Sequence, residues 1–132
     1  KYFSLPDEVF YLNLGSAAIA VYAFLLYREN RKTYQCTLSY KAIGYAIGAS
    51  NNTVRKYVLE LEAAGLIATN RTVVVGADGM ERNGCLRYTI LPVQNAVELR
   101  DRQRLAALDA AVERQKVKER LAASARKGGP VA

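Results

Sequence analysis

The segment from Tyr40 to Leu59 most restricts what this chain can fold into. It reads YKAIGYAIGASNNTVRKYVL, a helical pattern that small residues interrupt and that contains no aspartate or glutamate. Apolar residues recur with helical spacing on both sides of Gly48-Ala49-Ser50, which predicts two short helices joined by a tight turn. Ser39 and Ser50 stand where N-cap residues are expected, directly before each helix.

Two glycines in this segment fit a steep crossing of the two helices. Gly48 is expected in the turn, because glycine adopts a positive φ without strain. Gly44 leaves room where the helices cross, and Val54 supplies a branched apolar anchor in the later helix. These are the requirements of a helix-turn-helix motif. The residues predicted to face inward are Tyr40, Ile43 and Ile47 on the earlier helix and Val54, Val58 and Leu61 on the later one.

The rest of the chain predicts a mainly α protein with a small β-hairpin (α+β). A first main helix is expected over 17–29 with Ser16 as its N-cap, and a short strand over 32–38. Gly65 is expected to end the helix that starts after Ser50. Two β-rich segments, LIATNRTVVV and CLRYTIL, flank GADGMERNG, which predicts a hairpin with a long flexible tip.

The composition changes after Pro92 and suggests a division of the chain. Residues 93–127 are alanine-rich, dense in charge of both signs and free of glycine and proline, which predicts one long helix. The expected parts are therefore a domain over 1–92, a helix over 93–127 that serves as a dimerisation element or a linker, and a disordered tail over 128–132. The chain begins at Lys1 without methionine, so we expect a piece of a longer protein.

Composition excludes several classes of function. The chain has no histidine, and its two cysteines, Cys36 and Cys85, are far apart in the sequence. Zinc sites and most catalytic constellations need more than this, so we expect no metal, no cofactor and no enzymatic activity. No apolar run approaches the roughly 20 residues that cross a bilayer, so we expect no membrane partner. We interpret the two cysteines as reduced thiols, which predicts a cytoplasmic protein.

The charge pattern indicates binding to a polyanion. The net charge is +7, and the segment from Asn30 to Leu59 carries five basic residues and no acidic one. If the predicted core residues point inward, Asn51, Asn52 and Arg55 are left exposed at the start of the later helix. Asparagine and arginine bind base edges bidentately, whereas hydroxyl and ammonium groups suit phosphates. The residues expected to contact phosphates are Lys41, Ser50, Thr53 and Lys56.

The run SYKAIGYAIGASNNTVRKYVLELEAAGLI resembles the winged helix-turn-helix of GntR-type bacterial regulators. Residues 3–43 are more similar to the DNA-binding domains of phage and plasmid replication initiators and replisome organisers. The resemblance implies a winged helix-turn-helix that binds double-stranded DNA in transcription regulation or replication initiation. It also implies that Arg82 and Asn83, at the tip of the wing, reach an adjacent groove. Leu59 departs from the family pattern, which has a polar residue there, and is expected to pack on the C-terminal helix.

Alternatives remain open at this point. The same fold can serve as a protein-interaction module, for which an exposed apolar patch around Leu59 and the hairpin would be the sign. Tyr40, Tyr45 and Tyr57 could donate to phosphates, although half-buried packing is the expectation we prefer. The two cysteines fall on strands that are expected to pair, so their thiols could be neighbours.

Overall fold

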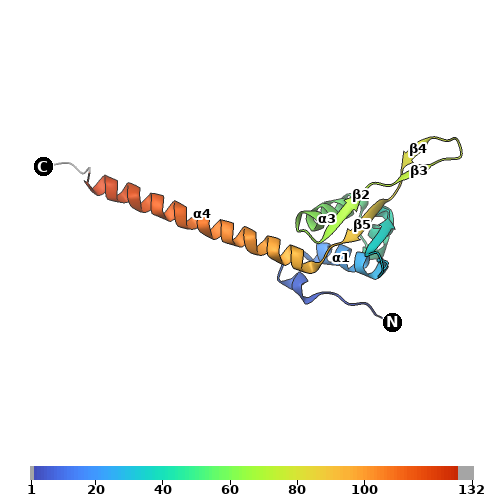
Figure 1. Ribbon diagram of the computed structural model, residues 1–132, viewed down its shortest axis with the longest axis horizontal. Helices are drawn as coiled ribbons and strands as arrows, with labels where there is room; N and C mark the ends of the chain where they lie inside the picture. The colour runs from blue at the N-terminus through green and yellow to red at the C-terminus, as the bar shows by residue number, and fades with distance from the viewer. Residues whose placement is uncertain (1, 128–132) are drawn as a thin grey trace. The chain divides into compact units, whose positions relative to one another are not determined.

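The computed structural model describes residues 2–127, and the predicted tail over 128–132 lies outside the described residues. The chain divides into two compact units, Lys1–Leu99 and Arg100–Ala132 (Figure 1). In chain order the elements are the 3-10 helix η1 (Asp7–Phe10), α1 (Ser16–Arg28), β1 (Gln35–Leu38), α2 (Tyr40–Ile47), α3 (Asn51–Ala63), β2 (Ile67–Asn70), β3 (Val73–Val75), β4 (Glu81–Asn83), β5 (Leu86–Ile90) and α4 (Val93–Lys127).

The first unit has one apolar core, formed by the helices and by one face of a sheet. Strands β1 and β2 both pair antiparallel with β5, which gives the order β1-β5-β2. The fully buried side chains include Val21 and Leu25 from α1, Ile43 from α2, and Tyr88 from β5. Ala96 near the start of α4 is also buried in this core. This arrangement is the α+β class that the sequence predicts.

The crossing of α2 and α3 has the geometry that the two glycines predict. Gly48 ends α2 with φ +72°, and its N–H donates to the Gly44 carbonyl. A Cβ atom at Gly44 would lie 2.3 Å from the Ala49 carbonyl oxygen and 3.4 Å from Val54 Cγ2. Only glycine therefore permits this approach between the turn and the body of α2.

The capping serines of the motif are confirmed, whereas the cap predicted for the first main helix is wrong. The Ser39 side chain accepts a hydrogen bond from Ala42 N, and the Ser50 side chain accepts one from Thr53 N. Helix α1 instead begins at Ser16, and its N-cap is Gly15, which has no side chain to bond. Gly65 follows α3 with φ +82°, as predicted.

Strand β1 is shorter than predicted because a turn occupies the residues before it. The Tyr34 N–H donates to the Asn30 carbonyl at 2.7 Å, and Tyr34 takes a positive φ of 57°. Pairing with β5 begins at Gln35, opposite Thr89.

The two cysteines are not cross-strand neighbours. Cys36 lies opposite Tyr88, and Cys85 lies outside the strands, before Leu86. Both thiols are free, and burial raises the pKa of Cys36.

The hairpin carries an additional ribbon where a flexible tip is predicted. Strand β4 comes from the predicted loop and pairs antiparallel with β3, Val74 lying opposite Arg82. The turn is confined to the few residues between Val75 and Glu81, and the ribbon extends beyond the three-stranded sheet (Figure 1). Arg82 and Asn83 are therefore strand residues, and their predicted place at the tip is wrong.

Helix α4 runs from Val93 to Lys127 without a break, over the predicted range. Val97, on its predicted apolar stripe, packs against the core of the first unit. The other members of that stripe, Leu105, Leu108 and Val112, are exposed. Among residues 2–127, none of the helices combines the length and the apolar character that crossing a membrane requires.

The contact at Gly44 predicts a strong effect of a single methyl group. We expect Gly44→Ala to lower the free energy of unfolding by about 2–3 kcal/mol, because the new Cβ overlaps the Ala49 carbonyl. Gly15→Ala is the control, since nothing lies within 4 Å of a Cβ there and only the N-cap preference for glycine, about 1 kcal/mol, is lost. Urea unfolding of both variants checks this, and equal losses would show that the crossing tolerates a side chain at Gly44.

Burial of Tyr22 predicts a loss of stability in alkaline solution. Desolvation, with the charges of Glu29 and Glu8, raises its pKa from 10.0 to about 12. Between these values the folded state keeps the phenol proton and the unfolded state loses it. The free energy of unfolding should therefore fall above pH 10, by up to about 1.4 kcal/mol per pH unit for this group.

Urea unfolding at a series of pH values measures this decline. Tyr22→Phe should make it shallower, whereas Tyr45→Phe, which changes an exposed side chain, should leave it in place. An identical decline in all three proteins would rule out Tyr22 as its source.

Candidate nucleic-acid interface

The first turn of α3 is held by a hydroxyl pair. Ser50 has an extended backbone, and its Oγ accepts a hydrogen bond from Thr53 N at 3.3 Å. The Ser50 hydroxyl also donates to Thr53 Oγ1 at 2.9 Å. Two residues that the sequence assigns to phosphate contacts therefore bond to each other, and their first role is to start the helix. Ser50 is exposed and Thr53 is half-buried, so both stay near the surface.

The buried and exposed faces of α3 are divided as the sequence predicts. Val54, Val58 and Leu61 are completely or almost completely buried. Their burial fixes the rotation of the helix about its axis and leaves the opposite face in solvent. The residues left exposed at the start of α3 are Asn51, Asn52, Arg55 and Lys56.

Part of this face forms one continuous surface. Asn52, Arg55 and Lys56 line a single hollow together with Leu59. The Lys56 ammonium lies 5.4 Å from the centre of the Tyr57 ring, so it stays at the surface against its neighbour's aromatic face. The structure thus brings three of the predicted binding residues together in one hollow on α3.

Three of the predicted residues, Lys41, Arg82 and Asn83, lie on other elements. Lys41 is exposed in the first turn of α2, and Asn83 is exposed on β4. Asn83 lines a second hollow with Ser39 and Tyr40, which precede Lys41 in the chain. Asn83 is therefore near the start of α2 and does not line the hollow on α3.

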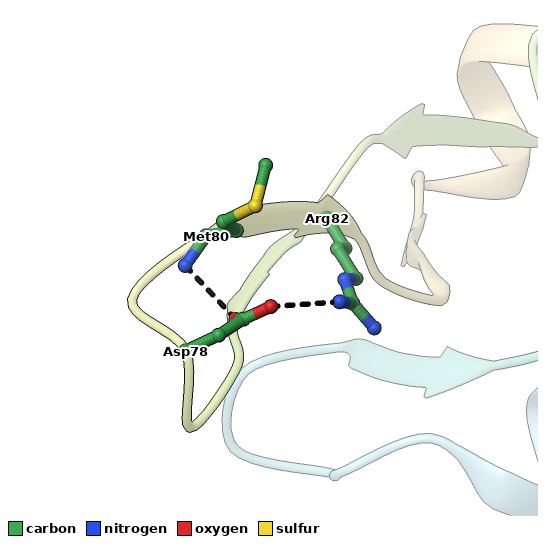
Figure 2. Close-up of polar contacts among 3 residues, drawn as sticks. All are labelled: Asp78, Met80 and Arg82. Carbon is green, nitrogen blue, oxygen red and sulfur yellow. Dashed lines mark hydrogen bonds and ion pairs between the residues drawn. The ribbon is translucent and has the colours of Figure 1, made fainter.

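Arg82 is engaged by an acid of its own ribbon. Its Nη2 lies 2.9 Å from Asp78 Oδ2, and the other carboxylate oxygen of Asp78 accepts a hydrogen bond from Met80 N (Figure 2). The side chains of Arg82 and Asp78 are 70% and 48% exposed. An ion pair this accessible to water contributes little stability and breaks easily. It nonetheless lowers the positive potential that Arg82 could present.

Two residues are more exposed than the preferred sequence predictions placed them. Tyr45 on α2 is 92% exposed, which contradicts half-buried packing for it, whereas Tyr40 and Tyr57 do pack against the core. Helical spacing alone could have found this, because Tyr45 lies opposite the Ile43–Ile47 face. Leu59, expected to pack on the C-terminal helix, is instead 53% exposed.

Neither a metal-ligand cluster among the described residues nor an acid in the first two turns of α3 accompanies this exposed face. Over residues 2–127 there is no group of three or more histidine, cysteine, aspartate or glutamate side chains that could hold a metal ion. The acids nearest to the exposed face along α3 are Glu60 and Glu62, and the Glu62 carboxylate accepts a hydrogen bond from the Thr69 hydroxyl. The first two turns of α3 therefore keep their basic and amide groups without a nearby acid in the sequence.

Comparison with protein families supports the motif. The family model described as a helix-turn-helix domain matches residues 12–67, a range that includes α1, α2 and α3. No curated protein matches the sequence.

Solved structures share the fold at low sequence identity. A "Possible transcriptional regulator from Methanosarcina mazei Go1" is 17% identical with a TM-score of 0.50, over 78% of this chain and 80% of that chain. A MarR-family transcriptional regulator from Silicibacter pomeroyi is also 17% identical, with a TM-score of 0.42 over 95% of this chain and 80% of that chain. A second MarR-family structure, SP03579, has 17% identity and a TM-score of 0.43 over 91% and 79% of the two chains.

The first of these matches, at a TM-score of 0.50, shows the fold: a winged helix-turn-helix with a long C-terminal helix. The two MarR-family matches fall below that score. Neither resemblance drawn from the sequence, to GntR-type regulators or to replication initiators, is shown by these matches.

The Ser50 cap predicts that Ser50 contributes to the free energy of unfolding, whereas its neighbour Asn51 contributes little. Ser50→Ala should lower the free energy of unfolding by about 1 kcal/mol, because Thr53 N loses its acceptor. Asn51→Ala should change it by less than about 0.5 kcal/mol, because that side chain is exposed. Chemical denaturation of the two variants measures both values, and a larger loss for Asn51→Ala would contradict this division of roles.

Proposed function

We propose that this chain binds double-stranded DNA with sequence preference, with α3 in the major groove. The observation that carries the proposal is the exposed, acid-free start of α3, set outward by the burial of Val54, Val58 and Leu61. Helix-turn-helix proteins make base contacts from this part of the second helix. The chain's net charge of +7 favours the association with a polyanion.

Each exposed residue receives a role from its chemistry. Arg55, Asn51 and Asn52 read base edges, because guanidinium and amide groups bind guanine and adenine bidentately. Lys56 and Lys41 contact phosphates, together with the hydroxyls of Ser50 and Thr53 and the free amides of the first turn. Arg82 and Asn83 are the proposed wing contacts, and Arg82 must first exchange Asp78 for a phosphate.

The process we propose is regulation of transcription in a bacterial, phage or mobile-element setting. Its support is the description of the solved structure that shares the fold as a possible transcriptional regulator. Replication initiation, the second process that the sequence resemblance implies, has no support among the matches. Within this proposal the chain acts by binding in the cytoplasm, without catalysis.

We further propose that two copies pair through α4. Leu105, Leu108 and Val112 are exposed and lie on one side of the helix, at the spacing that a second helix can cover. Pairing would let two copies of α3 address half-sites about 34–36 Å apart. A linker to a further domain is the alternative role of α4.

A protein-interaction module is the second candidate function, and one observation favours it. Leu59 and the valines of β3 are exposed, which is the apolar surface that such a role would need. A domain of this kind would fail to shift duplex DNA even at low salt. Selection of bound duplexes from a random pool separates the two candidates and, if a site emerges, gives the duplex for the measurement below.

Substitution of a base-reading residue and of a phosphate-binding residue should lower DNA affinity in different ways. The first loss should depend on the DNA sequence, and the second on the salt concentration. Arg55→Ala should cost about 1–3 kcal/mol of binding free energy and relax the preference for the selected site. Lys56→Ala should weaken binding to all duplexes by a similar factor and reduce the salt dependence of binding. Lys118→Ala, which removes an exposed charge from α4, is the control.

Fluorescence anisotropy with selected and scrambled duplexes over a range of salt concentrations measures these effects. Equal, salt-insensitive affinities of the wild type, Arg55→Ala and Lys56→Ala would discard the proposed interface.

A further inference from the structure

The ribbon of β3 and β4 has one apolar strand and one polar strand. Val73, Val74 and Val75 of β3 are 58%, 55% and 64% exposed, and they point to both faces of the ribbon. Strand β4 consists of Glu81, Arg82 and Asn83, and within residues 2–127 the only strand that pairs with it is β3. Proteins usually protect a free strand edge with charged residues or proline. The β4 edge has that protection and the β3 edge does not.

Hydrogen bonds at both ends of the ribbon define which backbone groups point toward β4. The Gly84 N–H donates to the Thr72 carbonyl at 2.7 Å. At the turn, the Gly76 N–H donates to the Met80 carbonyl at 3.0 Å. Residues that bond across an antiparallel pair alternate with residues that do not. Thr72 and Gly76 therefore belong to the set that bonds to the partner strand.

The same alternation determines the free edge of β3. Val74 lies midway between Thr72 and Gly76, so its N–H and C=O also point toward β4, opposite Arg82. Val73 and Val75 direct their N–H and C=O groups the other way. Among the described residues no backbone or side-chain group bonds to them on that side. The β3 edge thus offers two unpaired donor–acceptor sets, two residues apart.

An edge of this form is complementary to itself. If two copies of β3 run antiparallel about a two-fold axis through Val74, Val73 of one copy lies opposite Val75 of the other. Each such pair can exchange both of its backbone hydrogen bonds, and the two Val74 side chains meet on the opposite face. All side chains brought together are valines, so the contact buries apolar surface from both copies.

The ribbon is close to neutral, so two copies of it can approach each other although the whole protein is basic. The net charge of the chain is +7, but residues 71–83 contain two basic and two acidic residues. Arg82 on β4 and Asp78 in the turn already form an ion pair with each other (Figure 2).

We propose that the β3 edge is a self-association surface, where β3 of one copy pairs antiparallel with β3 of a second copy about Val74. The pairing joins two ribbons into one four-stranded sheet. The strands are only three residues long, so the contact is weak at low concentration and forms when copies are brought close together. It is separate from any contact through α4 and does not depend on DNA binding.

Disulfide trapping tests the register. In a background with Cys36→Ser and Cys85→Ser, Val74→Cys should form a covalent dimer when oxidised glutathione is the oxidant, because directly opposite residues have Cβ atoms about 5 Å apart. Val73→Cys is the matched control, since the same residue of the second copy lies diagonally, about 7–8 Å away. We expect Val74→Cys to cross-link about ten-fold faster than Val73→Cys, and circular dichroism confirms that each variant is folded.

A proline series tests the hydrogen bonds. Val75→Pro removes an outward N–H without removing a bond to β4, and it should slow cross-linking of Val74→Cys about ten-fold. Glu81→Pro is the control: it removes an N–H on the outer edge of β4, away from β3, and should leave the cross-linking rate of Val74→Cys unchanged.

Equal rates for Val74→Cys and Val73→Cys, or no covalent dimer with either at high protein concentration, would overturn the proposal. Equal rates with and without Val75→Pro would do the same. The solution contains no DNA, so a negative result leaves the proposed DNA-binding function untouched.

Discussion

The close approach between the Gly44 backbone and the Ala49 carbonyl determines where α3 points. The Gly44 carbonyl accepts hydrogen bonds from both Gly48 and Ala49, so the turn is folded back onto α2. A side chain at Gly44 would push the turn away and change the direction in which α3 leaves it. Val54 packs against the same glycine, and this contact links the turn to the apolar core.

The exposed face of α3 follows from these packing requirements. Once the valines and Leu61 are buried, the helix has no freedom to rotate, and its amide and basic side chains must remain in solvent. Ser50 serves the fold by starting the helix, and the same position orients the first free amides outward. Stability and the proposed recognition thus depend on one set of contacts, which is why Ser50 belongs to both.

The sequence predicted the elements whose pattern is local. Helical periodicity identified α2 and α3, composition without glycine or proline identified α4, and the capping serines and glycines identified the ends of α2 and α3. Prediction from the sequence failed for elements whose conformation depends on pairing between residues far apart in the chain. Glu81-Arg82-Asn83 has little intrinsic preference for a strand, yet it is one because β3 lies opposite. The ion pair that engages Arg82 likewise depends on the turn that brings Asp78 back toward β4. The residues assigned to DNA contact were placed on the surface by periodicity, but their contacts remain a prediction.

A ¹H–¹⁵N NMR titration of the chain with duplex DNA at low salt tests the central claim most directly. The account predicts that amide signals from Ser50 to Lys56 shift on addition of the duplex, that those between Leu105 and Leu121 shift far less, and that the shifts diminish as salt is added. Shifts confined to α4 or to the β3–β4 ribbon, with the start of α3 unchanged, would contradict it.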